Sequence, residues 1–148
     1  MRLLLDTNVL SESIRSRPNP KVVDWFSSQL NEELAISLIT LAELGDGIST
    51  ARNEARQKML QKWLSDEIEA AFQGRTLPLS LDILLNWIKL SRKFRLSGKP
   101  RNPSDMLLAA TARVHNLTIV TRNVRDFADT GIVVYDPWHD RTHRMGPP

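Results

Sequence analysis

The amino-acid sequence predicts an α/β fold, a three-layer α/β/α sandwich whose central, mostly parallel sheet is covered by helices on both faces. Short apolar runs of strand type alternate along the chain with longer segments that carry apolar residues at helical spacing. The length of 148 residues and the ordinary apolar and charged fractions fit one globular domain. No internal repeat or low-complexity linker divides the chain, so no second domain is expected.

The predicted elements follow from this alternation. Strands are expected over residues 3–5, 34–38, 76–79, 117–121 and 132–135. Helices are expected over residues 8–15, 20–30, 40–48, 53–72, 82–94 and 103–115. Pro103 suits the first position of the last helix, and residues 97–104 form a basic loop before it. We expect residues 1–138 to form the domain and the polar residues 139–148 to be a flexible C-terminal tail.

Composition excludes several classes of function. The chain has no cysteine, which rules out disulfides, thiolate metal sites and cysteine nucleophiles, and which fits a reducing cytoplasm. It has no apolar stretch of membrane-spanning length and no signal-peptide pattern at its start, so a cytoplasmic protein with no membrane partner is expected. Between residues 89 and 125, nine Lys and Arg residues face a single acid, Asp105. This excess of positive charge fits either a solvated helix face and loop or a surface that attracts nucleic acid.

Acidic side chains follow several of the predicted strands. Asp6 comes directly after the first strand, Glu43 a few residues after the second, and Asp105 opens the helix that leads to residues 117–121. Since ligands of open α/β sheets collect at the carboxyl ends of the strands, these acids are expected to converge there. Gathered carboxylates repel one another and raise at least one pKa unless a cation neutralises them. An oxygen-only set of this kind suits Mg²⁺ or Mn²⁺.

A purely structural role competes for most of these acids. Each of three acids stands three residues after a Thr or Asn, which is the spacing of a capping box: Thr40 with Glu43, Asn102 with Asp105, and Asn123 with Asp126. Acids in first turns also interact favourably with the helix dipole. Asp6 follows a hydrophobic strand at a place where no cap is obviously needed, so a functional role is favoured there.

Four segments together resemble a known family: LLLDTNVLSE, SLITLAELGDGI, DMLLAATARVHNLTIVTRNVRDF and the closing DPW. They are similar to the PIN-domain family, and within it to the VapC- and FitB-like ribonuclease toxins of type II toxin–antitoxin systems. The resemblance spans nearly the whole chain. It implies a parallel α/β sandwich, metal-dependent endoribonuclease activity, a homodimer, and a cognate VapB-like antitoxin that occupies the active site.

The resemblance also assigns roles to individual residues. Its four catalytic positions fall on Asp6, Glu43, Asp105 and Asn123, of which the three acids would bind Mg²⁺ or Mn²⁺. Thr7, Asn8 and Thr121 would hydrogen-bond the carboxylates and hold their rotamers. The metal would lower the pKa of a bound water that attacks the RNA phosphodiester in line. Candidates for contacts to RNA phosphates are Lys99, Arg101 and Arg122. Asp126, which is charged, competes with Asn123 for the fourth position.

Other functions fit the sequence less well. A phosphatase of the haloacid dehalogenase type needs a second acid where Asn8 stands. A Ser, His and Asp hydrolase lacks a suitably placed histidine, and the spacing of His139 and His143 fits either a metal pair or a solvated tail. The remaining alternative is a non-catalytic PIN-fold protein that binds RNA or a partner. Five apolar residues are expected to line an antitoxin groove or a dimer interface: Val22, Trp25, Phe26, Trp63 and Leu64.

Overall fold

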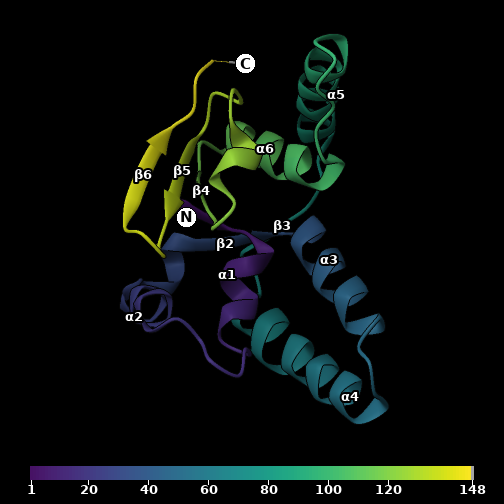
Figure 1. The fold of residues 1–148 in the computed structure, drawn as a ribbon, viewed down its shortest axis with the longest axis vertical. Coiled ribbons are helices and arrows are strands. Elements are labelled where there is room, and N and C mark those ends of the chain that lie inside the picture. The colour runs from purple at the N-terminus through teal and green to yellow at the C-terminus, as the bar shows by residue number, and fades with distance from the viewer. Residues whose placement is uncertain (148) are drawn as a thin grey trace.

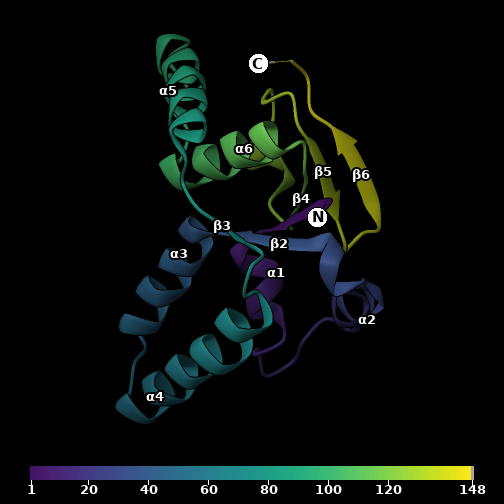
Figure 2. The same ribbon diagram turned by 180° about the vertical axis from the view of Figure 1, so that it is seen from behind.

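The computed structural model describes residues 1–147, which form a six-stranded sheet between two layers of helices (Figure 1 and Figure 2). The strands are β1 (Leu3–Leu5), β2 (Leu34–Ser37), β3 (Thr76–Leu77), β4 (Thr118–Val120), β5 (Val133–Asp136) and β6 (Arg141–Arg144). They lie in the order β3-β2-β1-β4-β5-β6, and all neighbours are parallel except β5 and β6. The predicted α/β fold with a mostly parallel sheet is therefore confirmed.

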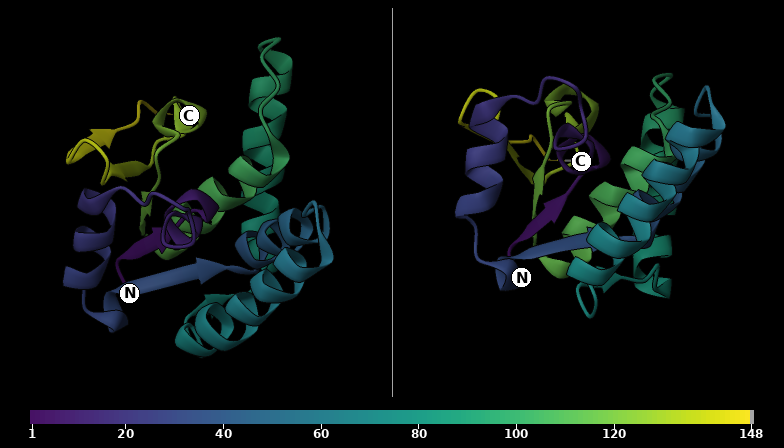
Figure 3. Two further views of the ribbon diagram at one scale, coloured as in Figure 1. Left: turned by 60° about the horizontal axis from the view of Figure 1, so that its bottom comes forward. Right: turned by 90° about the horizontal axis from the view of Figure 1, so that it is seen from below.

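The helices divide between the two faces of this sheet. They are α1 (Thr7–Glu12), α2 (Pro20–Ser28), α3 (Leu38–Ser49), α4 (Glu54–Trp63), α5 (Leu81–Leu96) and α6 (Pro103–His115). Three short helical segments complete the connections: η1 (Asn31–Glu33), η2 (Leu64–Glu69) and η3 (Val124–Phe127). Helices α5 and α6 pack on one face, whereas α1, α2 and α4 pack on the other. Figure 3 shows α2 and α6 on opposite sides of β1.

Two hydrophobic clusters result, because successive side chains of a strand point to opposite faces. Leu4 and Ile119 are fully buried against the α5 and α6 side, whereas Leu5 and Val120 are fully buried against the α1 and α2 side. In the register between β1 and β4, Leu5 lies beside Val120. Asp6 directly follows β1 and Thr121 directly follows β4, so this register places them next to each other at the carboxyl edge of the sheet.

Most predicted elements occur with small differences at their ends. The helix predicted over residues 103–115 has those bounds, with Pro103 at its start. The helix predicted over 40–48 begins earlier, at Leu38, because the Ser37 hydroxyl caps it by accepting from the backbone N–H of Ile39 at 3.2 Å. The single helix predicted over 53–72 is α4 followed by a π-helical turn, η2. The apolar stripe identified the element but not this change in its winding.

The C-terminal region differs from the prediction. Residues 139–148 were expected to be a flexible tail, but Arg141–Arg144 forms β6 and pairs with β5 in antiparallel register, with His143 opposite Val134. Trp138, at the start of the connection, is only 6% exposed. A strand at the edge of a sheet has a backbone partner on one side only and faces solvent on the other, so it can carry charged side chains. The expected boundary at residue 138 therefore falls inside a hairpin.

Two further expectations concern exposed surface. Val22 and Trp63, which were expected to line an antitoxin groove or a dimer interface, are 1% and 7% exposed and belong to the core on the α1 and α2 side, and both also line an apolar groove on that side. Trp25 packs against Tyr135, with ring centroids 5.4 Å apart. Within residues 1–147, no helix combines the length and apolar character that crossing a membrane requires.

Candidate active site

Asp6 is the most tightly held residue of the carboxyl edge. Its Oδ1 accepts a hydrogen bond from the backbone N–H of Thr7 at 2.7 Å. Its Oδ2 accepts from the Thr121 hydroxyl at 2.6 Å and from the Asn8 side-chain amide at 3.0 Å. The residue is 7% exposed. Three donors therefore fix the carboxylate while it remains open to solvent on a small area.

The Thr121 hydroxyl links the ends of β1 and β4. While it donates to Asp6, it accepts from the Asn8 amide at 3.0 Å and from the backbone N–H of Asn123 at 3.0 Å. A hydroxyl has one donor and two acceptor positions, so all of them are used. The Asn8 carbonyl oxygen in turn accepts from the backbone N–H of Arg122 at 3.1 Å. The predicted hydrogen-bonding roles of Asn8 and Thr121 beside Asp6 thus have a direct geometric counterpart.

Asp6 also has a structural role that the sequence did not suggest. Its extended backbone and its hydrogen bond from Thr7 make it the N-cap of α1. The expectation that no helix cap is needed after the first strand is therefore wrong, because α1 begins immediately after β1 and Asp6 caps it. The side chain serves two purposes, with Oδ1 capping the helix and Oδ2 engaged by Thr121 and Asn8.

Glu43 projects from α3 toward the same edge. Its Oε2 accepts from the Thr7 hydroxyl at 2.8 Å, which ties α3 to the start of α1. Because α3 begins at Leu38, Glu43 lies in the second turn and the capping box proposed with Thr40 does not form; Thr40 is buried inside the helix. The capping alternative is therefore wrong for Glu43, and the carboxylate instead joins α3 to the start of α1 beside Asp6.

Asp105 lies in the first turn of α6. The Asn102 side chain caps this helix by accepting from the backbone N–H groups of Ser104 and Asp105 at 2.9 and 3.2 Å. The capping alternative for this segment is confirmed for Asn102, and it leaves the Asp105 carboxylate free for another use. Asp105 is half-buried, directly before Met106, which is fully buried.

The carboxylates influence one another. Burial, followed by the charges of Asp126, Asp6 and Glu43, raises the pKa of Asp105 to about 6. Burial is also the main cause that raises the pKa of Asp6, and the charge of Glu43 adds to it, while the hydrogen bonds from Thr121, Thr7 and Asn8 act in the opposite direction. Burial is thus the first cause of both raised pKa values, and the repulsion expected between gathered acids adds to it.

The donor chemistry fits a hard divalent cation. Carboxylates from the end of β1, from α3 and from α6 interact through their charges, and a cation among them would offset both the repulsion and the burial of charge that raise the pKa values of Asp6 and Asp105. Within residues 1–147, no three acid or imidazole groups are close enough to enclose an ion as they stand. The carboxylates are thus near enough to interact through their charges but are not drawn into a closed cage.

Asn123 and Asp126 occupy different places around this cluster. The backbone of Asn123 is fixed to Thr121, and Asn123 and Asp126 both line a cavity that faces the C-terminal hairpin. Asp126, in η3, makes the largest charged contribution to the raised pKa of Asp105. The side chain of Asn123 does not cap η3, so the capping pair expected for these two residues does not form.

The three basic residues proposed for RNA contacts have separate surroundings. The Arg101 guanidinium lies 4.4 Å from the centre of the Phe94 ring and makes long contacts to the backbone oxygens of Arg125 and Asp126. Lys99 is exposed in the loop between α5 and α6. Arg122 is exposed beside Asn123, with its guanidinium 5.7 Å from the centre of the Trp138 ring. Of the three, Arg122 is linked to Asp6, because its backbone N–H donates to the Asn8 side chain, which in turn donates to the Asp6 carboxylate.

The structure adds residues that sequence reasoning set aside. Arg125, His139, Arg141 and His143 line the same cavity as Asn123, although three of them were assigned to a flexible tail. The signal that could have found them is the DPW segment followed by His139, since a buried Trp holds the chain close to the sheet. His139 and His143 share this cavity with arginines, and within residues 1–147 neither belongs to a group of three or more possible metal ligands.

Comparisons with known proteins agree with this arrangement. Residues 3–133 match the family model described as PIN domain. The chain is 36% identical to Toxin FitB of Neisseria gonorrhoeae, over 93% of this chain and 99% of that protein. It is 35% identical to VapC ribonuclease Y4jK of Sinorhizobium fredii, over 92% of this chain and 97% of that protein.

A solved structure shows the same fold. The crystal structure of FitAcB from Neisseria gonorrhoeae superimposes with a TM-score of 0.86 at 36% identity, covering 93% of this chain and 99% of that chain. The family match extends from β1 into the start of β5 and so includes all the carboxylates at the edge of the sheet. The hairpin strand β6 lies beyond it.

Proposed function

The chain belongs to the PIN domain family, and we propose that it is a divalent-metal-dependent endoribonuclease that acts as the toxin of a toxin–antitoxin pair. The observation that carries this proposal is the gathering of Asp6, Glu43 and Asp105, from three separate elements, at the carboxyl edge of the sheet. The printed names of the relatives, a toxin and a ribonuclease, supply the biological and chemical class. The absence of cysteine is consistent with action in the cytoplasm.

Asp6, Glu43 and Asp105 would hold Mg²⁺ or Mn²⁺. Their oxygens are the ligands these cations prefer, and the chain offers no thiolate that would favour a softer metal. When bound, such a cation neutralises the charge of an RNA phosphate and makes a water nucleophilic near neutral pH. The three acids supply the negative charge that recruits it to this edge.

The surrounding side chains would keep these acids in place. Thr121 and Asn8 hold Oδ2 of Asp6, and the Thr7 hydroxyl holds Oε2 of Glu43. Partners of this kind orient a ligand before the substrate arrives. We assign Asn123 the fourth position at the edge, and Lys99, Arg101 and Arg122 the attraction of the RNA backbone.

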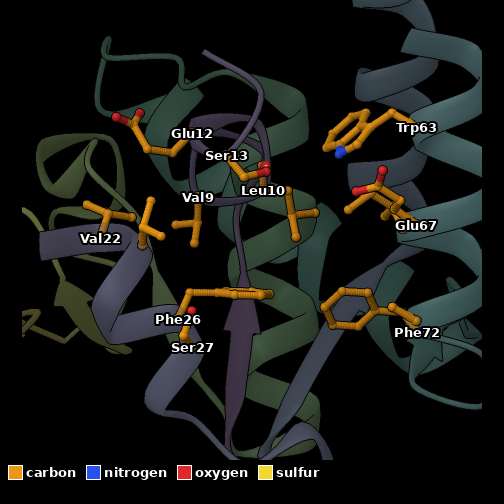
Figure 4. Close-up of a pocket in the computed structure, with 13 residues that line it drawn as sticks. Val9, Leu10, Glu12, Ser13, Val22, Phe26, Ser27, Trp63, Glu67 and Phe72 are labelled. Carbon is orange, nitrogen blue, oxygen red and sulfur yellow. The ribbon is translucent and has the colours of Figure 1, made fainter. Parts of the chain in front are cut away.

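The proposed antitoxin partner has a matching surface. An apolar groove with a volume of about 280 Å³ lies between α1, α2, α4 and η2 (Figure 4). Val9, Leu10 and Phe26 line it, together with Phe72 and part of Trp63. Figure 4 shows these apolar side chains directed toward a common space. A helix of the antitoxin that presents apolar residues at helical spacing fits such a groove.

A second copy of the chain is the other proposed partner. Leu81, Leu85 and Ile88 are 71%, 48% and 45% exposed, and their spacing places them along one stripe of α5. An exposed apolar stripe of this kind marks an interaction surface. A symmetric dimer would cover the stripe of one copy with the same stripe of the other.

RNA cleavage by the purified chain tests the activity. Wild type, Asp6→Asn and Asp105→Asn are incubated with total RNA in Mg²⁺ or Mn²⁺, with Asp46→Asn as the control. Asp46 is exposed on α3, the helix that carries Glu43. We expect wild type and Asp46→Asn to cleave RNA. Loss of a hydrogen-bond partner of a metal ligand typically lowers activity roughly 10–100-fold, so the two variants that remove a ligand itself should lose more cleavage activity than that. EDTA should stop cleavage.

Two results would contradict the proposal. Full cleavage by Asp6→Asn would show that the carboxylate edge is not the active site. Wild-type protein that binds RNA in the presence of metal but leaves it intact would be a non-catalytic RNA-binding member of the family.

A further inference from the structure

A second cavity, which we call the basic cavity, opens beside the carboxylate edge with a volume of about 600 Å³. One wall is formed by residues 122–126, which include η3, and the other by the β5–β6 hairpin. Three arginines line it, Arg122, Arg125 and Arg141. Its volume lies within the roughly 300–1,000 Å³ of typical small-ligand sites. It differs from the apolar groove in both position and chemistry.

The acids of this cavity do not cancel its positive charge. Asp136 is 5% exposed, and its two oxygens are engaged by the backbone N–H of Trp138 at 2.8 Å and by His139 Nδ1 at 2.7 Å. Asp126 is the other acid, and it lies toward Asp105. Three guanidinium groups therefore share the lining of this space with two carboxylates, which leaves an excess of one positive charge, and the two oxygens of Asp136 are already engaged by Trp138 and His139. Such a surface attracts an anion.

The DPW segment positions two of the side chains. The Arg122 guanidinium lies 5.7 Å from the centre of the buried Trp138 ring, which orients the group while leaving its N–H edges free. A carboxylate only accepts hydrogen bonds, so contact with Asp136 places the proton of His139 on Nδ1 and leaves Nε2 free. The His139 side chain is 68% exposed, so Nε2 is available to a ligand.

The framework of the site ties the basic cavity to the carboxylate edge. The backbone N–H of Arg122 is bonded to the Asn8 side chain, and that of Asn123 to the Thr121 hydroxyl. Asn8 and Thr121 both hold Asp6. A strand of nucleic acid whose scissile phosphate lay at Asp6 would therefore pass its neighbouring nucleotide over this cavity.

We propose that the basic cavity binds the nucleotide next to the scissile bond of an RNA strand, with Arg122, Arg125 and Arg141 on its phosphate and His139 Nε2 accepting from its ribose 2′-hydroxyl. The inference rests on the proposed ribonuclease function and names how that site holds its substrate. Guanidinium groups recognise phosphate through paired N–H donors. The 2′-hydroxyl is the group by which a protein distinguishes RNA from DNA at a given site.

The strand β6 provides a matched pair of arginines for the test. Arg141 and His143 point into the basic cavity, whereas Arg144 lies on the opposite face of the same strand and does not line it. Both arginines are exposed, so the fold tolerates their replacement. The comparison of Arg141→Gln with Arg144→Gln separates a local contact from a general loss of positive charge.

Binding is measured by fluorescence anisotropy in EDTA, so that no cleavage interferes. The probes are fluorescein-labelled oligouridylate of about ten nucleotides and the oligodeoxyuridylate of the same length. We expect Arg141→Gln and Arg125→Gln to weaken RNA binding about three- to tenfold and to reduce the slope of log affinity against log salt by about 0.7 each. Arg144→Gln should stay within about twofold of wild type. His139→Phe should weaken binding of the RNA probe and leave the DNA probe unchanged.

The results that overturn this proposal differ from those that overturn the nuclease. Equal losses in Arg141→Gln and Arg144→Gln, or no loss in either, refute the basic cavity as a binding site, even where cleavage of total RNA still depends on Asp6. Equal effects of His139→Phe on both probes refute the ribose contact. Cleavage of total RNA that does not depend on Asp6 refutes the proposed nuclease site, and the inferred place of the cavity beside the scissile bond falls with it.

Discussion

Replacing Asp105 by Asn should stabilise the metal-free protein while destroying its activity. Burial and the charges of Asp126, Asp6 and Glu43 raise the pKa of Asp105 from its ordinary 3.8 to about 6. An ionised Asp105 therefore costs the folded state free energy at neutral pH, and an amide of nearly the same shape removes that charge.

The structure sets the size of the effect. At about 1.4 kcal/mol for each pKa unit, the rise corresponds to roughly 3 kcal/mol as an upper limit. Asp105 is half-buried, so solvent screening reduces this value. Its charge also lies in the first turn of α6, where losing the interaction with the helix dipole costs about 0.3–1 kcal/mol. The net gain expected for Asp105→Asn is on the order of 1 kcal/mol, which corresponds to about 2–4 °C in Tm.

The pH dependence has a definite sign. Because the pKa of Asp105 is higher in the folded than in the unfolded state, the folded state binds the proton more tightly. The destabilising effect of this carboxyl is complete above about pH 7 and disappears as the pH falls through about 6 toward 4. The advantage of Asp105→Asn over wild type should therefore be largest above about pH 7 and shrink on acidification.

Urea denaturation in EDTA at about pH 7.5 and pH 5 measures these free energies of unfolding. Asp46→Asn, an exposed acid on α3, is the control and should match wild type. Added Mg²⁺ should stabilise wild type more than Asp105→Asn, since a ligand that binds only the folded state raises its stability. An Asp105→Asn protein that is less stable than wild type at the higher pH, or whose advantage grows on acidification, would refute the electrostatic reasoning.

Three further outcomes are expected. Thr121→Val removes the hydroxyl that serves Asp6, so stability should fall by about 1–3 kcal/mol and RNA cleavage by roughly 10–100-fold; unchanged cleavage would contradict the positioning role. Asn123→Asp should bind Mn²⁺ more tightly than wild type, as measured by calorimetry. If Asp126→Asn loses as much Mn²⁺ affinity as Asp6→Asn while Asn123→Ala binds as wild type does, the fourth position belongs to Asp126. Leu85→Glu should convert a dimer to a monomer in sedimentation, and a wild-type chain that is already monomeric at tens of micromolar would contradict the dimer.

Sequence reasoning succeeded where apolar pattern and local chemistry act together. The strand ending before Asp6 and the helix that begins at Pro103 are determined by neighbouring residues, and both occur as predicted. The gathering of Asp6 and Asp105 follows from the alternation of strands and helices. Asp6 follows β1 at the carboxyl edge, and α6, the helix that leads back to β4, begins at that same edge with Asp105 in its first turn. What the pattern could not supply was the exact winding of residues 53–72, where tertiary packing of the buried Trp63 and Ile68 accompanies a π-helical turn.

The C-terminal hairpin shows a different reason for failure. Residues 141–144 are charged or polar, so they have no apolar alternation by which to recognise a strand. They pair with β5 through their backbone, and the anchor is the buried Trp138 before them. A prediction based on side-chain polarity therefore gave a flexible tail at the segment that forms one wall of the basic cavity.

Asp6 shows how the fold and the site depend on the same contacts. Its carboxylate caps α1 through Thr7 and joins β4 through Thr121, so the register between β1 and β4 fixes its position. Asn8 extends this framework to the backbone of Arg122, where the basic cavity begins. A slip of one residue in this register would separate Asp6 from Thr121 and turn the strand's side chains to the opposite face. The buried residues of the two strands exclude that slip, and hydrophobic packing thereby maintains the alignment between the carboxylates and the basic cavity beside them.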